Sequence, residues 1–171
     1  RYLGFEIHGV EHLEGLEGPV VFAANHSSHL DTVAVYAALP AVWRSTLAPA
    51  MSQDFFQALF EISHARLGVR CWEAFQFLLA CGLFNAFPIP QKLAGTRRAL
   101  QYAAELVDDG YSLLFFPEGT RSLDGSVLPF QSGISLIASK LRVAVVPVRI
   151  DGLFSLFPAG ATWPKSGPVS V

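Results

Sequence analysis

The sequence predicts an α/β fold in which a mostly buried central sheet is flanked by helices. Apolar runs of strand length alternate along the chain with segments whose apolar residues recur at helical spacing, and this alternation is typical of parallel layer folds. Two of the runs, Pro19–Ala24 and Ser112–Phe116, are almost continuously apolar, as expected of strands covered on both faces. Since the sequence has neither an internal repeat nor a low-complexity linker, we expect one domain over residues 1–171.

The composition excludes two classes of protein. Hydrophobic residues make up 51% of the chain, which is enough apolar surface to exclude a disordered chain. The net charge of −2 and the lack of Lys/Arg runs argue against nucleic-acid binding. Only 15% of the residues are charged, against about 25% in an ordinary soluble domain, so an apolar surface besides the core is expected. Cys71 and Cys81 lack metal-ligand spacing and are interpreted as reduced, structural thiols.

The first part of the chain predicts two strands and a helix. Leu3–Gly9 and Pro19–Ala24 are short runs of β-prone residues. After the second run the apolar residues recur at helical spacing, and Ser28 with Asp31 forms an S-x-x-D signal for the start of a helix. Because proline cannot continue a helix, this one is expected to end near Pro40.

The middle of the chain predicts a strand over Trp43–Ala50 and an amphipathic helix over Ser52–Ile62. A longer amphipathic helix is expected over Gly95–Asp109, with Gly110 as its C-terminal cap.

The last part predicts strands over Ser112–Phe116 and Val143–Ile150, with a short helix over Ser135–Leu141 between them. Pro147 removes a main-chain donor from the second of these strands, which is therefore expected either to lie at a sheet edge or to end at Pro147. The chain ends at Val171 inside an apparent strand and begins without a methionine, so both ends are interpreted as cut from a longer protein.

The first candidate site is Asn25-His26-Ser27-Ser28-His29-Leu30-Asp31, where a predicted strand gives way to a helix. A histidine can take a proton from a hydroxyl when a carboxylate holds its tautomer, and Asp31 is placed to be that carboxylate. Five residues on one helix differ in direction by about 140°, so His26 must lie in the loop and fold back to reach Asp31. Alternatively, Asp31 only caps the helix and His26 is a loop histidine. His29 is a rival base, and the remaining histidines are interpreted as structural or surface residues: His8, His12 and His64.

The second candidate site is Phe116-Pro117-Glu118-Gly119-Thr120-Arg121-Ser122, directly after a predicted buried strand. Gly119 allows a ligand to approach the main chain, Thr120 offers a hydroxyl, and the guanidinium of Arg121 suits a phosphate. Glu118 could bind a hydroxyl or orient Arg121. The alternative is an ordinary turn with a surface Glu/Arg pair.

These motifs, followed by Val146-Pro147-Val148, resemble the signature of the glycerolipid acyltransferase family, often called PlsC-like. That signature is H-x-x-x-x-D, then F-P-E-G-T-R-S, then a V-P-V strand, and it brackets nearly the whole chain in the same order. The resemblance implies a glycerol-phosphate acyltransferase-like fold and transfer of a fatty acyl group from acyl-CoA or acyl carrier protein to a lysophospholipid or glycerol phosphate.

The resemblance also implies roles for individual residues. His26 would be the general base on the acceptor hydroxyl and Asp31 would orient it, while Glu118, Gly119, Thr120 and Arg121 would hold the acceptor's phosphate. No metal or bound cofactor is implied. A peripheral position on a membrane lipid surface, on the cytoplasmic side, is expected.

The chain departs from the family pattern in its second block. Where the family has G-x-x-F-I-x-R, this sequence has Asn85 to Gln91, so a neutral amide stands where an arginine is usual. Gln91 and Lys92 are the substrate-binding residues expected there, with Lys92, Arg97 or Arg98 as possible sources of the missing charge. The chain also starts without the helical, membrane-seating segment of many members, and so resembles acyltransferase domains fused within larger proteins.

One uncharged stretch, Ala74–Gln91, covers 18 residues. Spanning a bilayer takes about 20 predominantly apolar residues, whereas polar residues and prolines interrupt this stretch. A helix over Trp72–Phe84 that lies in the membrane interface or lines an acyl tunnel is favoured, with a buried core helix as the alternative.

Two other functions stay open at this point. In a thioester hydrolase, water would take the acceptor's place. A catalytically silent lipid-binding domain of a larger protein would keep the fold without the reaction.

Overall fold

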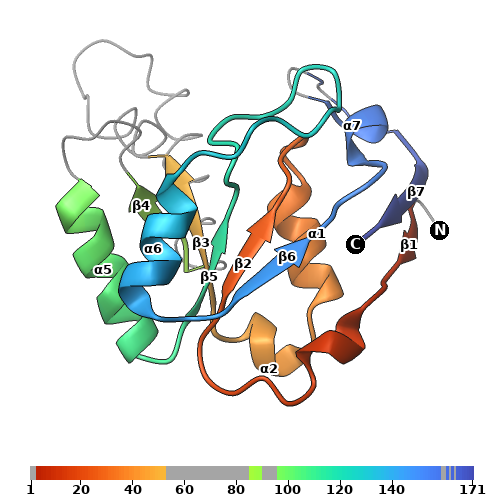
Figure 1. Cartoon of the computed structure of the whole chain (residues 1–171). Helices are drawn as coiled ribbons and strands as arrows, with labels where there is room; N and C mark the ends of the chain where they lie inside the picture. Colours follow the sequence, from red (N-terminus) through yellow and green to blue (C-terminus); the bar gives the residue numbers. More distant parts are fainter. Residues whose placement is uncertain (1–2, 53–84, 90–95, 159–160, 162, 164) are drawn as a thin grey trace, which may run out of the picture.

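The computed structural model describes residues 3–52, 85–89, 96–158, 161, 163 and 165–171. Figure 1 shows the helices and strands in chain order: β1 (Leu3–Glu6), the 3-10 helix η1 (Val10–Leu13), β2 (Val21–Ala24), α1 (Asp31–Ala38), α2 (Ala41–Arg44), β3 (Leu47–Ser52), β4 (Phe87–Ile89), α5 (Thr96–Asp108), β5 (Ser112–Phe115), α6 (Gly133–Leu141), β6 (Val145–Val148), α7 (Leu153–Leu156) and β7 (Gly167–Ser170).

The central sheet has the strand order β4-β3-β5-β2-β6, and every neighbouring pair is parallel. The predicted α/β class is therefore confirmed. β6 lies at the edge, as Pro147 predicts. β1 and β7 form a separate parallel pair that brings the two ends of the chain together. An antiparallel bridge between Asp151 and Ser170 connects β7 to the chain just after β6.

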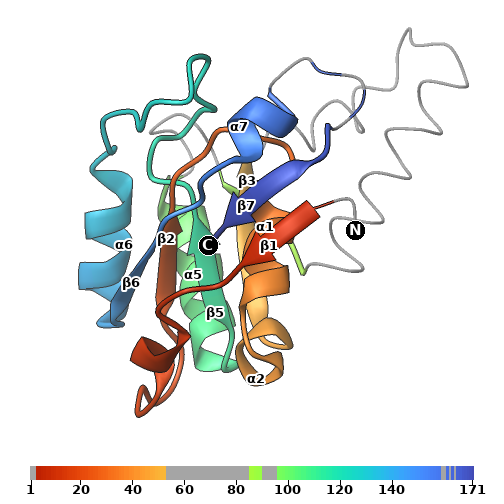
Figure 2. The ribbon, with the colours of Figure 1, turned by 90° about the vertical axis from the view of Figure 1, so that its right-hand side faces the viewer.

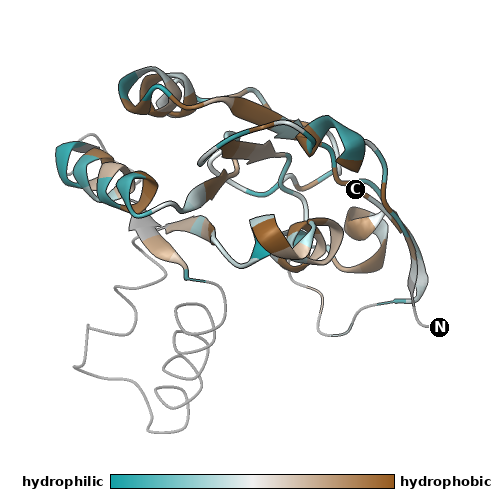
Figure 3. Ribbon diagram, turned by 90° about the horizontal axis from the view of Figure 1, so that it is seen from below, coloured by the Kyte–Doolittle hydropathy of each residue, from teal (hydrophilic) through white to brown (hydrophobic). Residues whose placement is uncertain are grey.

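Helices cover both faces of the sheet, with α1 and α2 on one side and α5 and α6 on the other (Figure 2). Each face of the sheet has its own hydrophobic core, and alternate residues of the central strands point into one core or the other. Phe22 and Leu114 face α1, whereas Val21 and Leu113 face α5 and α6. All four are fully buried. Burial of each such side chain contributes about 1.5–3 kcal/mol to the free energy of folding. Figure 3 shows mainly hydrophobic strands in the central sheet and hydrophilic residues along α5.

The strand expected over Trp43–Ala50 is wrong at its start. The helix α2 follows Pro40, whose carbonyl accepts bonds from the N–H groups of Trp43 and Arg44, and the strand begins only at Leu47. The Trp43 ring packs edge-on against Phe22 at 5.8 Å between centroids. A short apolar run does not distinguish these two structures because both bury it.

Several sequence predictions lie outside the described residues. These are the helix over Ser52–Ile62 apart from its first residue, the helix over Trp72–Phe84, and both cysteines. In the part of the chain that the structure does describe, no helix has the length and apolar character needed to cross a membrane.

Candidate active site

The two candidate motifs meet because they leave neighbouring parallel strands at the same edge of the sheet. His26 comes two residues after β2, and the segment 116–122 follows β5 directly. β2 and β5 are paired, with Ala23 opposite Phe115. The loops that follow parallel strands form the usual ligand-binding edge of an open α/β sheet.

His26 and Asp31 are in direct contact, as the predicted fold-back of the loop requires. His26 Nδ1 lies 2.8 Å from Asp31 Oδ2. The same oxygen accepts the N–H groups of Ser27 and Ser28, at 2.6 and 2.7 Å. Asp31 is completely buried at the first turn of α1, so these three donors hold a carboxylate that has no exposure to solvent.

The start of α1 differs from the one predicted by the S-x-x-D signal, in which Ser28 would be the N-cap residue. The helix begins at Asp31, with Leu30 rather than Ser28 in the N-cap position. The Ser28 hydroxyl instead accepts the Leu30 N–H and donates to the carbonyl of Phe157. The residue expected as the cap therefore ties the histidine loop to the segment after α7.

The contact with Asp31 selects one tautomer of His26. An ionised carboxylate only accepts hydrogen bonds, so Nδ1 carries the proton and Nε2 keeps its lone pair. Among the described residues, none hydrogen-bonds to Nε2. The ring stacks on Phe116 at 4.1 Å between centroids, with 22° between the planes, and keeps 22% of its side-chain surface exposed. The arrangement leaves a fixed, partly exposed imidazole whose Nε2 has no hydrogen-bond partner among the described residues.

Glu118 faces the protein interior. It is 3% exposed. Its Oε1 accepts the N–H of His26 at 2.8 Å, and its Oε2 accepts the N–H of Leu128 at 3.0 Å. Both carboxylate oxygens are therefore engaged with main chain.

The next three residues of the segment have different surroundings. Gly119 has a φ of 71°, the left-handed region that favours glycine, and a Cβ there would collide with the Gln131 side chain. In this structure it is the Gln131 side chain that lies close to the main chain of Gly119, where the sequence predicted the approach of a ligand. Thr120 is exposed, and Arg121 is half-buried with its guanidinium against the His29 ring.

His29, the rival base, contacts Arg121 and has no hydrogen bond to Asp31. Arg121 Nη1 lies 2.8 Å from His29 Nδ1. Burial, and then the positive charge of Arg121, lowers the pKa of His29 from its ordinary 6.5. A neutral imidazole accepts a bond from the guanidinium, so His29 is suited to hold Arg121 and not to act as the base.

The remaining predicted residues are placed as follows. His8 and His12 are exposed, which agrees with a surface role. Gln91, Lys92 and His64 lie outside the described residues, although β4 ends at Ile89, two residues before Gln91. In the described ranges no cluster of three or more His, Cys, Asp or Glu side chains could hold a metal ion.

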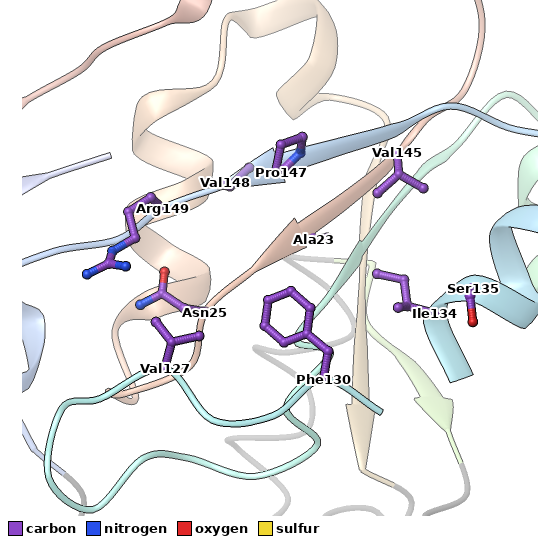
Figure 4. A pocket seen from close by; sticks show the side chains of 10 residues that line it. All are labelled: Ala23, Asn25, Val127, Phe130, Ile134, Ser135, Val145, Pro147, Val148 and Arg149. Carbon is purple, nitrogen blue, oxygen red and sulfur yellow. The ribbon is translucent and has the colours of Figure 1, made fainter. Parts of the chain in front are cut away.

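Sequence reasoning missed an apolar groove of about 630 Å³ between β6, α6 and the loop after β5 (Figure 4). One of its lining residues is Asn25, which precedes His26 in the sequence. The side-chain amide of Asn25 accepts the N–H of Ile150 and donates to the Ile150 carbonyl. The lining of the groove comes from four separate segments, so only the tertiary structure assembles it: Ala23, Asn25, Val127, Phe130, Ile134, Ser135, Val145, Pro147, Val148 and Arg149.

The fold and the site define a parallel α/β domain with a histidine–carboxylate pair where its central strands end. The protein-family model described as Acyltransferase matches residues 4–151, and the chain belongs to this acyltransferase family. The PlsC-like resemblance of the motifs is thereby confirmed at the level of the family.

Similar proteins carry a more specific description. The chain is 32% identical over 152 residues to a 1-acyl-sn-glycerol-3-phosphate acyltransferase of Chlamydomonas reinhardtii, covering 89% of this chain and 40% of that protein. It is 28% identical over 145 residues to 1-acyl-sn-glycerol-3-phosphate acyltransferase alpha of Homo sapiens, covering 84% and 44%. The crystal structure of the 1-acyl-sn-glycerophosphate acyltransferase PlsC from Thermotoga maritima superposes with a TM-score of 0.69 at 28% identity, over 99% of this chain and 59% of that one. The chain thus spans less than half the length of these curated relatives.

Proposed function

We propose that this chain is the catalytic domain of a glycerolipid acyltransferase. It transfers a fatty acyl group from an acyl thioester to a free hydroxyl of a lysophospholipid, with 1-acylglycerol 3-phosphate as the first acceptor to test and glycerol phosphate as the second. The observation that carries the proposal is the 2.8 Å contact between His26 and a fully buried Asp31, beside an arginine supplied by the neighbouring strand's loop. The names of the similar proteins support the choice of acceptor.

The proposed reaction needs no covalent enzyme intermediate. His26 Nε2 takes the proton of the acceptor hydroxyl while the oxygen attacks the thioester carbonyl carbon. When the tetrahedral intermediate collapses, the C–S bond breaks, an ester remains, and the imidazolium returns its proton to the departing thiolate. Asp31 stabilises the imidazolium through the Nδ1 contact and keeps the ring in the required tautomer.

Phosphate binding is assigned to the exposed end of the segment after β5. Arg121 presents a guanidinium suited to a phosphate, and Thr120 adds a hydroxyl next to it. Gln91 and Lys92, which come after β4 in the sequence, remain further proposed contacts to the phosphate.

The donor's acyl chain is assigned to the groove of Figure 4. The groove is almost entirely apolar, and its lining includes Asn25, the neighbour of His26 in the sequence. The proposal therefore places the acyl chain in this groove, with the thioester at His26.

A peripheral position on a lipid surface is also part of the proposal. Leu123 and Phe130, in the loop after β5, are 86% and 60% exposed, and Trp163 is 84% exposed. Large exposed apolar side chains near a lipid-active site favour membrane contact. Sedimentation with phosphatidylcholine/phosphatidylglycerol vesicles tests this, because the double variant Leu123→Ser with Phe130→Ser should pellet less than the unchanged protein.

The decisive experiment measures thiol release from long-chain acyl-CoA, and in parallel from acyl carrier protein, with and without the two acceptors. Acceptor-dependent release that is lost in His26→Ala would support the transferase, since a general base contributes about 10²–10⁴-fold. Equal release without acceptor would instead indicate a hydrolase. No release from either donor, in a protein that is correctly folded, would indicate a silent lipid-binding domain.

A further inference from the structure

The segment 116–122 holds His26 from three directions. The ring of Phe116 stacks on the imidazole at 4.1 Å. Glu118 Oε1 accepts the His26 N–H at 2.8 Å, and the N–H of Ser122 donates to the His26 carbonyl at 2.8 Å. The peptide groups on both sides of the histidine are thus bonded to one loop of the neighbouring strand.

Glu118 has no access to a ligand in this arrangement. It is 3% exposed, and its second oxygen accepts the N–H of Leu128 at 3.0 Å. Its own carbonyl accepts a bond from the Gln131 amide, which fixes the next part of the loop as well. To reach an acceptor, the carboxylate would have to leave its buried position and give up its bonds to the N–H groups of His26 and Leu128.

The main chain of the histidine loop is consequently held by two buried carboxylates. Glu118 takes the N–H of His26, and Asp31 takes the N–H groups of Ser27 and Ser28. The bonds to these three consecutive N–H groups fix the main-chain position of His26, and that position determines whether Nδ1 of the ring can reach Asp31.

We propose that Glu118 is a positioning residue, which fixes the main chain of His26 for catalysis and makes no contact with the acceptor. This inference rests on the proposed function and revises the substrate-binding role expected for Glu118. Of the four residues expected to hold phosphate, Thr120 and Arg121 are then the two whose side chains are available to it.

The proposal is tested by steady-state kinetics of Glu118→Gln. A glutamine oxygen accepts one of the two N–H groups, but its NH2 group faces the other donor, so the His26 loop shifts. Because small misplacements of catalytic groups cost about 10²-fold, we expect kcat to fall by roughly that factor while KM for the acceptor stays within about twofold. Arg121→Ala is the comparison for an acceptor contact and should raise that KM.

The matched control is Asp109→Asn, a change of an exposed carboxylate just after α5 whose side chain has no hydrogen bond to the segment 116–122 or to His26. It should leave both kinetic constants near those of the unchanged protein. A Glu118→Gln variant with a raised acceptor KM and an unchanged kcat would overturn the proposal. If the unchanged protein shows no acceptor-dependent release, the proposed function itself fails, which is a separate outcome.

A second measurement needs no variant of Glu118. Hydrogen exchange of the His26 and Leu128 amides in the unchanged protein reports directly on the two bonds to the carboxylate. We expect both amides to stay protected when the acceptor is saturating. Loss of protection at either amide on acceptor binding would mean that Glu118 turns to the ligand, and would refute the inference.

Discussion

Replacing Asp31 by Asn is the most direct test of the charge beside His26. An asparagine oxygen can occupy the place of Oδ2 and accept the same three donors, from His26, Ser27 and Ser28. The change therefore removes the charge and keeps most of the geometry. Oδ1 of Asp31 is buried without a hydrogen-bond partner among the described residues, and the NH2 group would take its place.

The expected loss of activity follows from the imidazolium. With about 4 Å between the charge centres, the carboxylate stabilises it by about 4 kcal/mol at an effective dielectric constant of 20. Since each 1.36 kcal/mol is tenfold in rate, kcat should fall by about 10³-fold. The acceptor KM should change little because Asp31 is completely buried and therefore out of reach of an acceptor.

The expected loss of stability is smaller. An unpartnered buried NH2 group lowers the free energy of unfolding by about 1–3 kcal/mol. The hydrogen bonds to a neutral amide are also weaker, but the variant no longer has to bury a charge, which compensates for part of that loss. Thermal unfolding followed by circular dichroism measures this cost, and thiol release at saturating donor and acceptor measures kcat. The matched control is Asp151→Asn, at an exposed carboxylate paired with Arg149, where both quantities should stay close to those of the unchanged protein. A folded Asp31→Asn protein that keeps kcat within about threefold would refute the proposed role of the charge.

Three further predictions concern pH and the groove. The pKa of His29 is lowered from 6.5, so the unfolded chain binds that proton first as the pH falls; stability should decline below pH 6.5, and His29→Gln should flatten the decline in urea titrations. Hydrogen bonds from Ser126 and Ser122 lower the pKa of Asp124 to about 2, so its contribution is present above about pH 4 and is lost as the pH falls towards 2; Asp124→Asn should unfold with a weaker pH dependence in that range, and an unchanged acid transition would contradict this. Val145→Trp fills a groove position that is 45% exposed and should reduce turnover of long acyl-CoA relative to short acyl-CoA, whereas Val42→Trp, at an exposed valine on α2, should leave that ratio unchanged.

The sequence predicts the sheet well where burial is extreme. β2 and β5 are nearly continuous apolar runs because helices cover both of their faces, and such runs have few alternative structures. The prediction fails at Trp43, where a single helical turn buries the same apolar side chains that a strand would bury. The inward direction of Glu118 depends on its bond to His26, 92 residues away in the sequence. The groove likewise joins Ala23 and Asn25 to the distant segment 127–149, and local patterns do not encode such contacts.

The spacing between His26 and Asp31 has a physical explanation in this structure. Asp31 begins α1, so its side chain extends back over the turn before the helix, where the N–H groups of Ser27 and Ser28 point at the same oxygen. This oxygen therefore lies close to the main chain of the loop, within reach of the His26 imidazole. One residue more or fewer would rotate the carboxylate by about 100° around the helix axis, away from both the main-chain donors and the ring. Asp31 Oδ2 thus fixes both the main chain of the loop and the tautomer of His26. Two residues five positions apart can make this contact only because the buried strand β2 before the loop and the helix α1 after it fix the loop between them.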